Sequence, residues 1–91
     1  MYGKNMYYVY VMKSIKDGKL YTGSTTNLEE RLEAHVQGSV LATKGRRPLK
    51  LIYYEAFLNK TDAGKEELFY KTGHGREVLR KKIKESMKLK I

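Results

Sequence analysis

Two stretches of the chain carry apolar side chains in the pattern of β-strands. Residues 6–12 and 49–57 are rich in tyrosine, valine, isoleucine and leucine, and both faces of each stretch are apolar. A strand that is apolar on both faces suits the interior of a sheet, so residues 6–12 are expected to form a central strand. Glu55 is the one acidic residue in the later stretch. It is expected to be either an edge-facing carboxylate or the salt-bridge partner of a lysine.

A tight turn follows the first strand. Asp17-Gly18 tolerates the positive φ angles of such a turn, and residues 19–23 resume an extended pattern. Residues 24–26, a run of serine and threonine, then read as a polar connection. Because strands joined by a tight turn run antiparallel, the sheet is expected to be at least partly antiparallel.

The first helix is predicted over about residues 28–37. Asn27 is a suitable N-cap, and Glu30 completes a pattern that resembles a capping box. Gly38 can end the helix in the left-handed conformation. Residues 39–48 are expected to form a loop before the third strand.

Two more helices follow that strand. Asn59 or Thr61 can cap the second helix, which is expected to run to about Thr72. Residues 73–75, Gly-His-Gly, should break it sharply. A basic C-terminal helix is then predicted over about residues 76–91.

This order of elements is strand, strand, helix, strand, helix, helix. It predicts a small α+β fold in which helices flank a three-stranded sheet. A chain of 91 residues suits one domain, with its core over about residues 6–83.

The composition limits the chemistry. The chain has no cysteine, which excludes disulfides and thiolate metal sites. A metal must then bind oxygen or the two histidines, His35 and His74, and a hard cation such as Mg²⁺ suits oxygen ligands. No apolar run is long enough to cross a bilayer, and residues 1–5 lack the apolar continuation of a signal peptide. A cytoplasmic protein without a membrane partner is therefore expected.

The charge points to a polyanionic partner. Nineteen Lys and Arg against ten Asp and Glu give a net charge of +9. Nucleic acid is the first candidate for such a partner, and a solvated face that only aids solubility is the alternative. The candidate phosphate-binding residues are Lys44, Arg46, Arg47, Lys71, Arg76 and Arg80.

Several polar residues stand at spacings that suit a catalytic site. Arg31 and His35 are four residues apart, so they lie on one face of the first helix. Two tyrosines and a later glutamate are further candidates. Taken singly, each of the candidate residues could be structural, because tyrosine is common in strands and charged residues commonly pair on helices. The candidates are Tyr10, Tyr21, Arg31, His35 and Glu67.

Their combined spacing resembles the GIY-YIG nuclease family. The first motif reads Tyr8-Val9-Tyr10 and the second Tyr21-Thr22-Gly23, with Arg31, His35 and a later glutamate in order behind them. The stretch 71–77 is similar to the short, single-domain bacterial branch of the family, which is related to the N-terminal nuclease domain of the excision-repair endonuclease. The resemblance covers about residues 6–83 and implies the GIY-YIG fold.

The resemblance also implies phosphodiester hydrolysis assisted by one divalent ion, Mg²⁺ or Mn²⁺. Tyr10 and Tyr21 correspond to the motif tyrosines, one of which helps to activate or orient the attacking water. Arg31 would neutralise charge on the scissile phosphate. His35 stands where a proton can be relayed from the first tyrosine, and Glu67 would be the sole protein ligand of the metal.

Other positions also matter to the resemblance. Gly23 would let the backbone come close to the substrate, and Ser24 stands where some members carry a lysine that contacts the transition state. The asparagine that many members place after the glutamate has no clear counterpart, although Thr72 or His74 could substitute. One residue of slippage would give Glu66 the role assigned above to Glu67.

The sequence therefore predicts a metal-dependent DNA endonuclease, structure-selective and acting in repair or recombination. Because the chain lacks an added recognition domain, we expect little base readout and a preference for branched, nicked or single-stranded substrates. A nucleic-acid-binding module that does not cleave is the alternative. RNA stays open beside DNA as the partner, and a monomer is compatible with these features.

Overall fold

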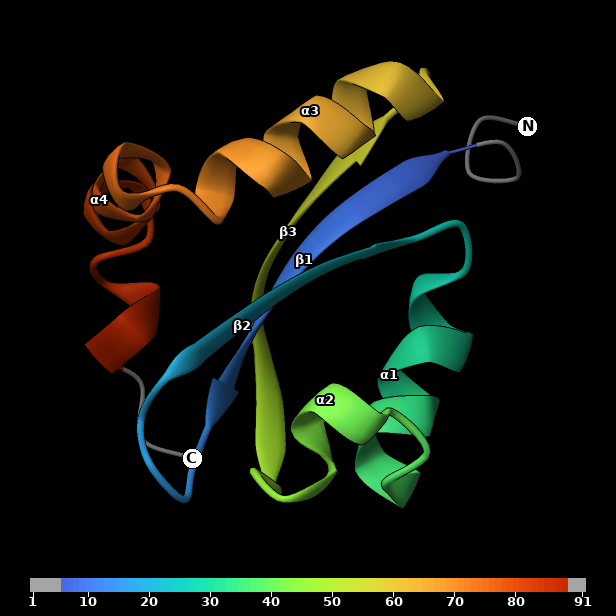
Figure 1. The fold of residues 1–91 in the computed structure, drawn as a ribbon, viewed down its shortest axis with the longest axis vertical. Coiled ribbons are helices and arrows are strands. Elements are labelled where there is room, and N and C mark those ends of the chain that lie inside the picture. The colour runs from blue at the N-terminus through green and yellow to red at the C-terminus, as the bar shows by residue number, and fades with distance from the viewer. Residues whose placement is uncertain (1–5, 89–91) are drawn as a thin grey trace.

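The computed structural model describes residues 6–88 of the chain (Figure 1). Residues 1–5 lie outside this part, and with them the stretch on which the signal-peptide expectation was based. The last three residues of the predicted C-terminal helix also lie outside it. The elements are β1 (Tyr7–Ser14), β2 (Leu20–Thr25), α1 (Leu28–Gln37), α2 (Leu41–Lys44), β3 (Leu49–Phe57), α3 (Lys60–Tyr70), α4 (Gly73–Lys82) and the 3-10 helix η2 (Ser86–Lys88).

The sheet is antiparallel throughout, with the strand order β2-β1-β3. The predicted central strand is confirmed, since β1 pairs with both neighbours. The turn between β1 and β2 places Gly18 at a φ of 73°, and Asp17 Oδ1 accepts the Lys19 backbone N–H at 2.8 Å. The expected α+β fold is confirmed.

The pleat of β1 sends its side chains to two different layers of helices. The helices α3 and α4 lie on one side of the sheet and α1 and α2 on the other (Figure 1). Val9 and Val11 are buried on the side of α3 and α4, whereas Tyr10 faces the side of α1 and α2. The α3 and α4 side holds the main apolar core. The buried residues there are Val9, Val11, Ala63, Tyr70, Leu79 and Ile83.

The helix caps largely follow the sequence. Asn27 Oδ1 accepts the Glu30 backbone N–H at 3.1 Å, and Gly38 ends α1 with a φ of 80°, so this helix has its predicted bounds. Asn59 is the cap of α3, because its Oδ1 accepts the Thr61 backbone N–H at 2.7 Å. The alternative cap, Thr61, therefore lies inside the helix.

Two predictions for the connections were wrong. Residues 39–48 are not all loop, because α2 forms a single turn there without a side-chain cap. Ser24 and Thr25 belong to β2 rather than to a connection, since they pair with Val9 and Tyr8 of the central strand. The backbone of β1, which the local sequence does not reveal, supplies the partners of the extended β2. The turn of α2 instead closes on the Val40 carbonyl, which accepts the backbone N–H groups of Thr43 and Lys44.

The predicted bounds of the last helix were also wrong. α4 begins at Gly73 because the Thr72 hydroxyl accepts the Gly75 backbone N–H at 2.9 Å, so the Gly-His-Gly stretch forms its first turn. The helix ends at Lys82, and the predicted length to residue 91 is not reached. A Cβ on Gly75 would lie 1.6 Å from the Phe69 carbonyl oxygen, so this glycine allows the close approach of α3 and α4.

Glu55 is a salt-bridge partner, the second of its two expected roles. Its Oε2 lies 2.9 Å from Lys82 Nζ and accepts the Tyr70 hydroxyl at 2.6 Å, so the network joins β3, α3 and α4. Tyr70 also lies 3.1 Å from Glu66 Oε2, which turns Glu66 toward the same network. Despite burial, hydrogen bonds from Tyr53, Tyr70 and Lys82 lower the pKa of Glu55 to about 2.

Within residues 6–88, no helix has both the length and the apolar character needed to cross a membrane. The expectation of one domain over residues 1–91 stays a prediction.

Gly75 lies in the first turn of α4, and Gly64 lies in the middle of α3. Replacement by alanine should have opposite effects on stability at these two positions. Gly75→Ala should lower the free energy of unfolding by about 1–3 kcal/mol, because its Cβ would overlap the Phe69 carbonyl. Gly64→Ala should raise it by about 0.5–1 kcal/mol, since its Cβ meets nothing within 4 Å. Urea denaturation measures both, and equal effects would contradict the tight crossing.

Candidate active site

Tyr10 is the centre of a buried polar cluster between β1 and α1. Its hydroxyl lies 2.7 Å from His35 Nε2 and accepts the Arg31 Nε–H at 3.3 Å. Tyr10 and His35 are both fully buried, with an exposed fraction of 0%. Arg31 and His35 share the face of α1 that their spacing predicted, and the fold turns this face toward the Tyr10 hydroxyl.

Tyr21 lies beside this cluster on β2. Its ring centroid is 6.4 Å from that of Tyr10 and 5.3 Å from that of His35. Gly23, two residues later, stands opposite Tyr10 in the strand register, and a Cβ there would lie 2.6 Å from Tyr10 Oη. The glycine of the second motif thus leaves the space that the hydroxyl of the first motif occupies.

Glu67 reaches β2 from α3. Its Oε1 accepts the Ser24 hydroxyl at 2.6 Å, and its Oε2 pairs with Lys71 Nζ at 2.8 Å. Ser24 therefore contacts the candidate metal ligand. Glu66 instead faces the network around Glu55, so the two adjacent carboxylates point to different parts of the molecule.

Burial and hydrogen bonds set the charges of these groups. Burial raises the pKa of Tyr10, despite the opposing hydrogen bond from Arg31, so its hydroxyl stays protonated near neutral pH. Burial, with the charge of Arg31, lowers the pKa of His35 and favours the neutral ring. Burial opposes the charge of Glu67, but hydrogen bonds from Lys71 and Ser24 lower its pKa overall and keep it anionic.

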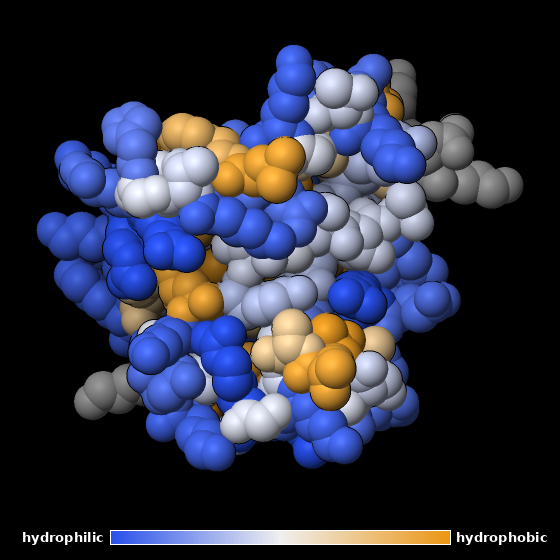
Figure 2. All heavy atoms as spheres, viewed as in Figure 1, coloured by the Kyte–Doolittle hydropathy of each residue, from blue (hydrophilic) through white to orange (hydrophobic). Residues whose placement is uncertain are grey.

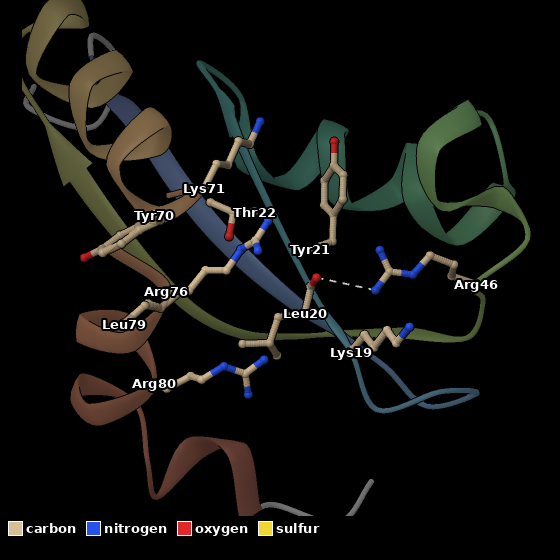
Figure 3. A pocket seen from close by; sticks show the side chains of 10 residues that line it. All are labelled: Lys19, Leu20, Tyr21, Thr22, Arg46, Tyr70, Lys71, Arg76, Leu79 and Arg80. Carbon is tan, nitrogen blue, oxygen red and sulfur yellow. Dashed lines mark hydrogen bonds between the residues drawn. The ribbon is translucent and has the colours of Figure 1, made fainter. Parts of the chain in front are cut away.

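A basic hollow lies next to this cluster, between β2 and α4 (Figure 3). Here it is called the β2–α4 groove, and it has a volume of about 560 Å³. Arg76 and Arg80 reach into it from α4, while Arg46 lies on the opposite side and donates to the Leu20 carbonyl at 3.4 Å. None of the described residues that line it is acidic. Its cationic residues are Lys19, Arg46, Lys71, Arg76 and Arg80.

The predicted phosphate-binding residues therefore divide between two places. Lys44 and Arg47 line a separate hollow beside α1 and α2. Arg47 donates there to the Lys44 and Val36 carbonyls, at 3.0 and 3.3 Å, and so fixes the loop after α2. The structure brings neither of them to the β2–α4 groove. Neither candidate substitute for the missing asparagine makes a described side-chain contact with Glu67: Thr72 caps α4, and His74 packs on Phe69.

The sequence reasoning missed Thr43 and Lys19. Thr43 is fully buried in α2, and its hydroxyl lies 2.7 Å from His35 Nδ1. No motif marks Thr43, because an isolated threonine in a short polar stretch carries no pattern. Lys19 stands two residues before Tyr21, and this alternation is a signal that could have placed it near the motif tyrosine.

The donor set suits a metal that keeps most of its water. Within residues 6–88, no group of three or more His, Cys, Asp or Glu side chains could hold an ion. The half-buried Glu67 carboxylate already attracts one cationic group, the Lys71 ammonium. Mg²⁺ commonly binds through one or two carboxylates together with water and substrate phosphates, so a single carboxylate fits such an ion.

Comparison with known proteins agrees with this architecture. The chain matches the model of the GIY-YIG catalytic domain over residues 6–84, and it belongs to this nuclease family. It is 49% identical over 67 residues to a UPF0213 protein of Clostridium perfringens, covering 72% of this chain and 71% of that protein. A UPF0213 protein of Staphylococcus haemolyticus is 46% identical over 67 residues, covering 72% and 80%.

A solved structure supports the same assignment. The solution NMR structure of a UPF0213 protein from Bacillus halodurans is 35% identical, with a TM-score of 0.51 and coverage of 81% of both chains. The predicted family and its short, single-domain branch are thus confirmed. Nucleases of this family generally use divalent metal ions.

Acid should destabilise the protein through His35. Its pKa is lowered in the folded state, so the unfolded chain binds more protons once the pH falls below the ordinary histidine pKa of about 6.5. Stability should therefore fall with pH in this range, with a limit of about 1.4 kcal/mol per pH unit for one proton.

Urea denaturation between about pH 7.5 and 5.5 tests this dependence across the ordinary histidine pKa. His35→Gln should flatten it, whatever its effect on stability at neutral pH. His74→Gln, at an exposed histidine of α4, is the control and should keep the wild-type slope. If His35→Gln keeps the wild-type dependence of stability on pH, His35 is not its cause.

Proposed function

We propose that the protein is a divalent-metal-dependent endonuclease that hydrolyses phosphodiester bonds in DNA. The observation that carries the proposal is the convergence of Tyr10, Arg31 and His35 beside Tyr21, with Glu67 at the same edge strand. These side chains come from β1, β2, α1 and α3, and they adjoin a groove whose charged residues are all cationic.

Cations of the groove would bind the substrate backbone. The phosphates of a nucleic acid bind Lys and Arg side chains whatever the base sequence, and Arg76 and Arg80 reach toward β2 from α4 (Figure 3). Hydrophilic side chains also dominate the α4 side of the molecule in Figure 2. A phosphodiester held there would lie next to Tyr21, which lines the groove.

Arg31 and Tyr10 would act on the reacting phosphate and water. The Arg31 guanidinium stays charged, because its hydrogen bond to Tyr10 raises its pKa, and it can stabilise negative charge that develops on phosphate oxygens. Tyr10 is a weak base when protonated, so His35 is needed as an acceptor for its proton. A Mg²⁺ or Mn²⁺ ion bound through Glu67 would supply further positive charge and a bound water.

The lining of the groove favours a structure-selective enzyme. Leu20, Tyr21 and Leu79 line it together with the cations, and apolar or aromatic surface of this kind suits a strand whose bases are accessible. Branched, nicked or single-stranded DNA offers such bases, as do intermediates of repair and recombination. RNA would meet the same cations, so the assay includes it.

One observation favours the alternative of a binding module that does not cleave. The Lys71 ammonium already neutralises Glu67 at 2.8 Å, and a protein that only binds phosphates needs no metal at this carboxylate. Wild-type protein that binds every substrate and cuts none, with Mg²⁺ or with Mn²⁺, would select this alternative.

Cleavage should depend on Glu67 and not on its neighbour. Glu67→Gln should reduce the rate about 10²-fold or more, because it removes the anionic ligand next to the scissile phosphate. Arg31→Met should do the same by removing the cation. Glu66 lies in the network with Tyr70, so Glu66→Gln should keep most of the wild-type rate.

Labelled single-stranded, duplex, flap and branched DNA, with a matching RNA, are the substrates for this comparison. Calorimetric titration with Mn²⁺ adds a readout that does not need cleavage, and Glu67→Gln should weaken that binding. If Glu66→Gln loses activity while Glu67→Gln keeps it, the metal role belongs to Glu66.

Two neighbouring cations of α4 test the role of the groove. Arg80→Ala should weaken DNA binding and reduce the slope of log affinity against log salt by about one, because one phosphate contact is lost. Lys81→Ala removes the same charge from a side chain that pairs with Glu77 outside the groove, and it should change the slope less. Fluorescence anisotropy over a salt series measures both, and equal slopes for the two variants would exclude a specific role for the groove.

A further inference from the structure

The hydrogen bonds around His35 can run in only one direction. Within residues 6–88, the Tyr10 hydroxyl has two hydrogen-bond partners, Arg31 Nε and His35 Nε2. Arginine has no acceptor, so the hydrogen of Tyr10 can only be donated to His35 Nε2. In the free protein Tyr10 is fully buried, so bulk water offers no other acceptor there.

This direction fixes the tautomer of the ring. A neutral imidazole carries one N–H and one bare nitrogen, and Nε2 must be bare to accept from Tyr10. The hydrogen is then on Nδ1, which lies 2.7 Å from the Thr43 hydroxyl oxygen. His35 therefore donates to Thr43 and accepts from Tyr10.

The far end of the chain agrees with this direction. The Thr43 hydroxyl has one further contact, the Val40 carbonyl oxygen at 3.5 Å. A carbonyl only accepts, so the Thr43 hydrogen can turn toward Val40 and leave a lone pair for His35 Nδ1–H. The same carbonyl accepts the backbone N–H groups of Thr43 and Lys44, at 3.1 and 3.0 Å, which holds α2 in place.

We propose that Thr43 is a positioning residue: its hydroxyl accepts the His35 Nδ1–H and so stabilises the tautomer that Tyr10 requires, with Nε2 free to accept the proton of Tyr10. The tautomer does not depend on any activity, while its catalytic consequence rests on the proposed nuclease function. α2 then has a role in the site, because it carries the Thr43 hydroxyl that contacts Nδ1.

The consequence for catalysis is a proton transfer that needs no rotation of the ring. The bound substrate would bring the attacking water to the Tyr10 hydroxyl. As this water forms its bond to phosphorus, the bond from phosphorus to the leaving oxygen breaks, and the leaving oxygen takes a proton from solvent. One O–H bond of the attacking water breaks in the same step, and that proton passes to Tyr10 Oη. The Tyr10 O–H bond breaks in turn, and its proton forms the N–H bond at His35 Nε2. The ring becomes doubly protonated with its Nδ1–H still bonded to Thr43, and the proton returns through Tyr10 because the Val40 carbonyl ends the chain.

Nitrogen-15 NMR reports the tautomer directly. In long-range proton–nitrogen spectra of the labelled full chain, His35 should show a protonated Nδ1 and a bare Nε2, with His74 identified by its loss in His74→Gln. Thr43→Ser keeps a hydroxyl and should keep this pattern. Thr43→Val removes it at nearly constant shape and should move the ring toward the Nε2–H form.

Cleavage of single-stranded and branched DNA is measured on the same variants. Thr43→Val should lose about tenfold or more, a part of the roughly 10²–10⁴-fold that general acid–base catalysis contributes. Thr43→Ser should recover most of the rate, and Thr61→Val, at an exposed threonine of α3, should match the wild type.

The outcomes test the tautomer and its catalytic consequence separately. A bare Nδ1 in the wild type, or an unchanged tautomer in Thr43→Val, overturns the positioning role. A changed tautomer with an unchanged rate overturns only its catalytic consequence. If the wild type cuts nothing, the nuclease function fails together with that consequence, and the spectra alone decide the tautomer. If Thr43→Val does not fold, Thr43→Ala replaces it.

Discussion

The burial of one tyrosine hydroxyl in the central strand is the constraint on which the rest of the site depends. Tyr10 is fully enclosed, and a buried hydroxyl without partners is costly, so the surrounding elements must supply them. α1 contributes Arg31 and His35 one turn apart, and β2 contributes a glycine that leaves room for the hydroxyl. The same contacts that satisfy Tyr10 hold a cation and a neutral imidazole around its oxygen.

The two faces of the sheet hold different networks of side chains. On the face toward α3 and α4, Val9 and Val11 lie in the apolar core, and the Glu55–Lys82 pair joins the edge strand to α4. Because α3 is fixed there, its adjacent carboxylates separate: Glu66 joins the structural network and Glu67 reaches β2. The position of α3 thus turns the two adjacent carboxylates toward different parts of the molecule.

The electrostatics of the site differ from those of the groove beside it. Around Tyr10, burial favours neutral groups, so the tyrosine keeps its proton and His35 stays uncharged. In the β2–α4 groove the cations remain accessible to solvent and to phosphates, with Arg76 and Arg80 among the exposed residues. Such an arrangement suits a polyanion that binds on the surface and presents one phosphate to a less hydrated centre.

The sequence by itself determined the features that local physics controls. Stretches that are apolar on both faces indicated β1 and β3, Asn27 and Gly38 indicated the ends of α1, and the spacing of Arg31 and His35 indicated their shared face. Tertiary structure decided the rest: that Thr43 lies behind His35, that α4 begins at Gly73, and that Lys44 and Arg47 lie away from the groove. These depend on contacts between segments far apart in the chain, whose partners and directions no local pattern encodes.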